Sequence, residues 1–176
     1  MPLIALTLAA LLAADSGMPV PAPYAGEQHR AIKALSEREI ADLAAGRGMG
    51  LAKAAELNGY PGPMHVLEHA EALALDPAQR EATQAIFERM RARAQALGQE
   101  LIEAERALDL LFASERAGAA AVDQALSRIG SLQAALRGVH LQAHVQQTAL
   151  LTRTQRERYA ELRGYAGGHA HGHHAS

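Results

Sequence analysis

The stretch from Pro77 to Ala113 most constrains what this chain can fold into, because Gly98 is the only glycine or proline after its first residue. Its apolar residues recur in steps of three and four, at Ile86, Met90, Ala94, Leu97, Leu101, Ala104, Leu108 and Phe112. That spacing places them on one face of an α-helix. The stretch therefore predicts one amphipathic helix, about 55 Å long at 1.5 Å per residue.

The following segment predicts a second long helix. Residues 114–118 make the reversal, and apolar residues then recur at Val122, Leu126, Ile129, Leu132, Leu136, Val139 and Ala143. Long helices joined by a short connection pack antiparallel. Shorter helices are expected to begin at Ser36, Met64 and Thr152, the second reaching Ala74. We predict an all-α fold of four to five helices, with the shorter ones packed on an antiparallel hairpin.

Composition agrees with a helical fold and excludes several other classes. Alanine supplies 40 of the 176 residues, while phenylalanine, tryptophan and tyrosine together supply six. Such a chain is a poor candidate for a sandwich, a barrel or a parallel sheet. The absence of cysteine excludes disulfides and thiolate metal sites. A net charge of −2 gives no electrostatic basis for binding nucleic acid. A core rich in alanine buries little area, so we expect a homodimer.

The first residues resemble a secretion signal. Residues 3–14 are an apolar run that is too short to span a bilayer, since a membrane helix takes about 20 residues. A signal cleaved between Ala13 and Ala25 fits this run, although Met1-Pro2 lacks the usual basic residue, and a buried helix is the alternative. The expected organisation is a signal and spacer over 1–25, a helical domain over 26–163 and a histidine-rich tail over 164–176.

Three helix starts share one capping pattern. Ser36, Asp76 and Thr152 each precede, by three residues, a glutamate or glutamine: Glu39, Gln79 and Gln155. This spacing is typical of a capping box, in which each side chain bonds the backbone N–H of the other residue.

Four of the nine histidines form two helical pairs. His65 and His69, like His140 and His144, are four residues apart, a spacing that places both rings on one helical face. If the hairpin folds about residue 116 and the short helix folds back about residue 75, both pairs meet the long helix near Glu88. Four imidazoles and a carboxylate suit Ni²⁺, Co²⁺, Cu²⁺ or Zn²⁺. The alternative is that the histidines are ordinary surface or core residues.

Two further histidine patterns have separate interpretations. Residues 65–69 match the H-x-x-E-H pattern of one protease class, but a protease also needs a third ligand and a cleft that this sequence does not indicate. We therefore expect binding rather than catalysis. The tail is interpreted as a low-specificity metal scavenger, with an expression tag as the alternative, and carries His169, His171, His173 and His174. His29 has no assigned role.

The segments LDPAQ (75–79) and LTRTQ (151–155) resemble the paired LTxxQ motifs of the Spy/CpxP-like periplasmic proteins. That superfamily includes ATP-independent chaperones, zinc-resistance-associated proteins and CnrX-type heavy-metal sensors. Residues 65–81 and 139–144 are similar to the sensor pattern, and the resemblance covers about 64–163. It implies that His65, His69 and His140 are ligands, and His144 stands where the pattern has methionine. The sensor's carboxylate position falls on Phe87, one residue before Glu88.

The resemblance implies a periplasmic metal-binding protein that acts in heavy-metal sensing or resistance. One divalent ion would bind between the short helix and the hairpin, and a membrane anti-sigma or sensor protein is the expected partner. Two alternatives stay open: a chaperone that holds unfolded clients and whose histidines are incidental, and metal buffering by the tail alone.

Overall fold

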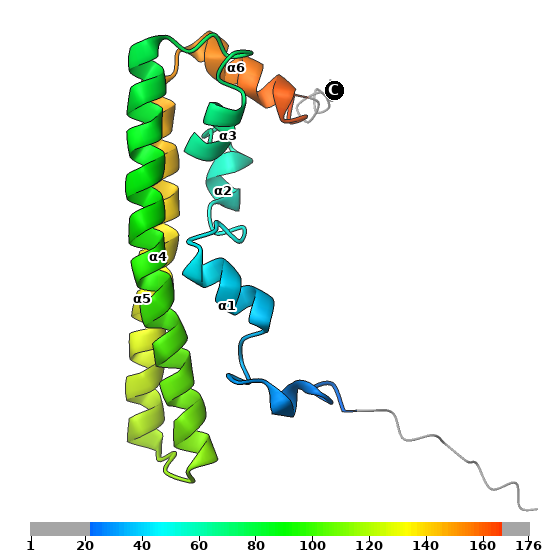
Figure 1. Cartoon of the computed structure of the whole chain (residues 1–176), viewed down its shortest axis with the longest axis vertical. Coiled ribbons are helices and arrows are strands. Elements are labelled where there is room, and N and C mark those ends of the chain that lie inside the picture. Colours follow the sequence, from blue (N-terminus) through cyan, green and yellow to red (C-terminus); the bar gives the residue numbers. More distant parts are fainter. Residues whose placement is uncertain (1–21, 167–176) are drawn as a thin grey trace, which may run out of the picture.

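The structure is a computed structural model that describes residues 22–166, and its cartoon is shown in Figure 1. These residues form one short 3-10 helix and six α-helices with no β-strand among them, which confirms the all-α prediction. In chain order the elements are η1 (Glu27–His29), α1 (Glu37–Ala44), α2 (Lys53–Glu56), α3 (Pro63–Glu68), α4 (Pro77–Ala113), α5 (Ala119–Leu150) and α6 (Arg153–Leu162). Within the same range, no helix has both the length and the apolar character needed to cross a membrane.

The two long helices, α4 and α5, run side by side in opposite directions, α1, α2 and α3 contact them, and α6 leaves one end of the hairpin at an angle (Figure 1). A buried cluster joins α1 to the middle of both long helices through Leu43, Leu97, Leu101, Leu132 and Leu136 among others. Gly98 allows this packing, because a Cβ there would lie only 2.2 Å from the Leu43 carbonyl oxygen. The glycine inside the long helix is therefore the point where α1 crosses it most closely.

A second buried cluster lies where α3, α6 and the ends of the long helices meet. It consists of Val66, Ala70, Leu73, Leu75, Leu151 and Tyr159. Positions 87–91 of α4 and 140–144 of α5 fall between the two clusters along the helices, and there the long helices line a cavity. The cavity therefore has a packed apolar cluster on either side.

All three predicted capping boxes are present, at the starts of α1, α4 and α6. The two glutamines also meet: Gln79 and Gln155 exchange side-chain amide hydrogen bonds of 2.9 Å in both directions. Gln79 donates in addition to the Leu150 carbonyl oxygen, and Gln155 to the Leu73 carbonyl oxygen. These bonds tie the start of α6 to the start of α4.

The sequence interpretation differs from the structure in two segments. The helix predicted over 64–74 ends at Glu68, and turns follow to Ala74, which has a left-handed φ of 48°. Helix α2 was not predicted at all. Residues 1–21 of the signal and spacer expected over 1–25, and the histidines of 167–176, lie outside the described residues.

Candidate metal centre

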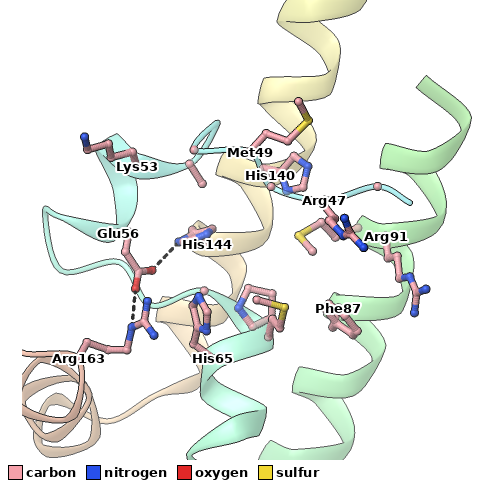
Figure 2. A pocket seen from close by; sticks show the side chains of 18 of the residues that line it. Arg47, Met49, Lys53, Glu56, His65, Phe87, Arg91, His140, His144 and Arg163 are labelled. Atoms are coloured by element: carbon pink, nitrogen blue, oxygen red, sulfur yellow. Dashed lines mark ion pairs between the residues drawn. The ribbon is translucent and has the colours of Figure 1, made fainter. Parts of the chain in front are cut away.

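A cavity of about 800 Å³ opens between α2, α3 and the pair of long helices. Three of the predicted ligands line it, namely His65 from α3 and His140 and His144 from α5 (Figure 2). The structure thus brings histidines from two elements to one space. The surroundings of each ring decide which of its nitrogens is available to a metal ion.

His144 is 9% exposed and is fixed by the turn that follows α2. Its Nδ1 lies 2.8 Å from the Tyr60 carbonyl oxygen, which can only accept, so Nδ1 carries the proton and donates. In the neutral ring, Nε2 then holds the free lone pair. A histidine that donates through one nitrogen to a carbonyl and presents the other is the usual arrangement of a metal ligand.

His140 is 3% exposed, and its Nε2 is buried without a hydrogen-bond partner in the described part of the chain. Burial lowers the pKa of His140, and the neighbouring His144 lowers it further, so the ring is neutral at pH 7. A buried polar atom without a partner is costly, by about 1–3 kcal/mol. Neutral imidazole is also the form that binds metals, so this nitrogen is available for an ion.

His65 comes from α3 and retains partial exposure, with 27% of its side chain accessible. Its Nδ1 lies 2.8 Å from Oε2 of Glu68, one turn later on the same helix. The carboxylate accepts this bond, which again leaves Nε2 free in the neutral ring. His65 and His144 are therefore oriented alike, each with Nδ1 engaged and Nε2 available.

Glu56, at the end of α2, adds a carboxylate that sequence reasoning missed. Its Oε1 accepts a 2.6 Å hydrogen bond from the Tyr159 hydroxyl and lies 3.4 Å from Nε of Arg163. Its Oε2 is buried, has no hydrogen bond among the described residues and lies 3.6 Å from Nδ1 of His144 (Figure 2). Burial raises the pKa of Tyr159, which keeps its proton and so remains a donor to Glu56.

Two predicted ligands lie outside this cavity. Glu88 is exposed and accepts a 2.7 Å hydrogen bond from Gln84 on the same helix. His69 follows the last residue of α3, and its φ of −103° and ψ of 17° are not helical. The backbone N–H of His69 donates to the His65 carbonyl oxygen at 3.1 Å, as in the last turn of a helix, but of these two histidines only His65 lines the cavity.

The donors are near one another but not assembled. Within residues 22–166, no three side chains of histidine, aspartate or glutamate are close enough together to hold one ion. His140 and His144 belong to the 32-residue α5, whereas His65 and Glu56 belong to helices of six and four residues. Closing the donors around an ion would therefore require movement of the short helices.

Comparisons with protein-family models, with curated proteins and with solved structures found no match to this chain. The fold and the site define its class on their own: an all-helical protein with a cavity lined by histidines from two helices.

Proposed function

We propose that this protein binds one transition-metal ion in the cavity and acts in heavy-metal sensing or resistance in the periplasm. The observation that carries the proposal is the presence of His65, His140 and His144 around one cavity, with His140 Nε2 buried and unpartnered. Imidazole nitrogens and a carboxylate are donors that suit Ni²⁺, Co²⁺, Cu²⁺ and Zn²⁺. The site binds and does not catalyse.

The proposed donors are His140 and His144 from α5, His65 from α3 and Glu56 from α2. This set differs from the ligands expected from the sequence, which included His69 and Glu88. An ion that favours the assembled donors draws α2 and α3 toward α5, and this shift presents a changed surface to a partner such as a membrane anti-sigma or sensor protein. The resemblance of the two capping motifs to the LTxxQ motifs of Spy/CpxP-like proteins supports this role. We also propose that the N-terminal segment directs export of the chain to the periplasm.

Metal binding by the tail histidines must be eliminated before the cavity is tested, and substitution does this without shortening the chain. Full-length protein in which His169, His171, His173 and His174 are changed to alanine is titrated with each divalent ion by isothermal calorimetry. The proposal predicts saturable binding of one ion per chain. If neither the four divalent ions nor Cu⁺ binds this variant, the cavity is not a metal site, and binding that only the chain with its tail histidines shows would favour metal buffering by the tail.

A chaperone role is the second candidate, because the far end of the hairpin exposes large apolar side chains. Leu110, Phe112 and Leu126 are each at least 50% exposed. Exposed apolar surface of this kind binds other proteins or a second copy of the chain. Suppression of client aggregation that is lost on changing Phe112 to serine, but not on changing His140 to alanine, would favour the chaperone.

A further inference from the structure

All three methionines of the described residues line the same cavity as the histidines. The sequence has five methionines, and Met1 and Met18 lie outside the described range. The other three come from three different parts of the chain: Met49 from the segment between α1 and α2, Met64 from α3 and Met90 from α4. The cavity therefore collects thioether sulfur as well as imidazole nitrogen.

These methionines do not serve as core filling. Neither buried cluster includes any of them. Met49 and Met64 are each 44% exposed, so much of each side chain is accessible from solvent. Flexible methionines at an accessible surface are adaptable contacts, and their sulfur is a soft donor.

Two methionines belong to segments that approach the His140 ring. Gly48 adjoins the ring, since a Cβ on Gly48 would lie 3.9 Å from His140 Nδ1, and Met49 is the next residue. Gln147 of α5 donates a hydrogen bond to Thr83 of α4. Because the two helices are antiparallel, residue 140, seven before Gln147, lies opposite residue 90, seven after Thr83. Met90 also shares a smaller groove with Val139 and Ala143, the neighbours of His140 and His144 in the chain.

The charge around the cavity disfavours a doubly charged ion. Arg47, Lys53, Arg91 and Arg163 line it, and Glu56 is the sole acidic residue among its lining residues. Glu56 already accepts from Tyr159 and lies beside Arg163, so part of its negative charge is engaged. Repulsion from fixed positive charges grows in proportion to the charge of the ion, and a monovalent ion experiences half of it.

We infer that the cavity selects Cu⁺, held by Nε2 of His140 and the thioethers of Met49 and Met90. Soft thioether ligands select Cu⁺ among the biological transition metals, and an imidazole completes such a set. This inference rests on the proposed metal-binding function and names the ion that the same site prefers. It changes the expectation of a divalent ion, because the sequence interpretation did not include the methionines.

The test compares Cu⁺ with Zn²⁺ in full-length protein lacking the four tail histidines. Cu⁺ affinity is measured under reducing conditions by competition with a chromogenic Cu⁺ chelator, and Zn²⁺ affinity by calorimetry. The double variant M49L/M90L keeps the apolar volume and removes both sulfurs. It should weaken Cu⁺ binding at least about tenfold, the smaller loss seen when a metal site is disturbed, and leave the Zn²⁺ affinity unchanged. M64L, the matched control, should leave both affinities unchanged.

Each other outcome has a definite meaning. If Zn²⁺ binds and H140A abolishes it while M49L/M90L leaves Cu⁺ affinity unchanged, the inference is overturned and the proposed function stands. If M64L alone weakens Cu⁺ binding as much as the double variant does, the assignment of Met49 and Met90 is overturned. If H140A alters the affinity for neither ion, both proposals fail. X-ray absorption of the Cu⁺-loaded protein should show sulfur scatterers, and a spectrum with nitrogen neighbours alone would contradict the thioether ligands.

Discussion

At the scale of single residues, Gly62 determines where His144 can lie. A Cβ on Gly62 would lie 2.9 Å from His144 Cε1 and 3.0 Å from its Nε2, the nitrogen proposed as a donor. The backbone φ of Gly62 is −83°, so alanine is sterically allowed there and the conflict is with the imidazole alone.

We predict that G62A displaces the ring of His144 and lowers the affinity for Zn²⁺ about tenfold. The substitution should also lower the free energy of unfolding by about 1–3 kcal/mol through overpacking. Gly130 is the matched control, because it is an exposed glycine of α5 with no atom within 4 Å of an added Cβ. G130A should leave binding unchanged and raise the free energy of unfolding by about 0.5–1 kcal/mol. Calorimetry and urea denaturation measure both, and equal metal affinities for G62A and G130A would contradict the account.

Tyr159 supports the site through one hydrogen bond to Glu56. Its side chain is 3% exposed, so Y159F retains the packed ring and removes only the hydroxyl that donates to the buried carboxylate. We expect the free energy of unfolding to fall by about 1–3 kcal/mol, because a buried acceptor loses its partner. Y24F, at a tyrosine that is 76% exposed, should change stability by less than about 0.5 kcal/mol. Equal urea midpoints for Y159F and wild type would show that Glu56 does not depend on Tyr159.

At the scale of elements, the capping glutamines act as a pair. Gln79 and Gln155 each close a helix N-terminus and each donate to the other. We predict that the double-mutant cycle of Q79A and Q155A gives a coupling free energy of about 1 kcal/mol, as expected for residues in one hydrogen-bond network. Denaturation of the four proteins measures it, and strictly additive losses would mean that the two helix starts are independent.

The cap of α1 predicts a dependence of stability on pH. Hydrogen bonds from the Ser36 side chain and backbone lower the pKa of Glu39. A carboxyl group whose pKa is lower in the folded state adds stability above its unfolded pKa, and this contribution is lost as pH falls through the folded value. The stability difference between wild type and E39Q should therefore be largest at neutral pH and shrink as the pH falls through the lowered pKa of Glu39. E37Q, in the same turn, controls for removal of a nearby charge, and a difference that persists in acid would refute the assignment.

Periodicity and capping predicted the long helices and their starts well, because both signals are local. Gly98 marks the limit of that reasoning: it is tolerated inside α4 since Leu43 crosses there, and only the tertiary structure shows this contact. The early end of α3 was not predicted, because residues 69–76 contain no glycine or proline to indicate it.

Glu56 was missed for a related reason. It lies in a single turn of helix that has no periodic pattern, and its role depends on contacts with Tyr159 and Arg163, over a hundred residues later. The turns at Asn58-Gly59 and Pro61-Gly62-Pro63 were the available signal. They connect α2 to α3, and Glu56 and the histidines line the same cavity.

At the scale of the whole molecule, the far end of the hairpin carries exposed Leu110, Phe112 and Leu126. If this end joins two copies, as the thin alanine-rich core leads us to expect, the double variant L110S/F112S should shift sedimentation from dimer to monomer. The metal affinity should not change, because the cavity lies along a different part of α4 and α5. A wild-type protein that sediments as a monomer at all concentrations would exclude the dimer.

The measurement that tests the central claim most directly compares H140A with H29A in full-length protein whose four tail histidines are alanine. His140 is buried and lines the cavity, whereas His29 belongs to η1 and lies outside it. The account predicts that H140A weakens binding of the preferred metal roughly 100-fold and that H29A leaves it unchanged. Equal affinities for the two variants would contradict a metal site in this cavity.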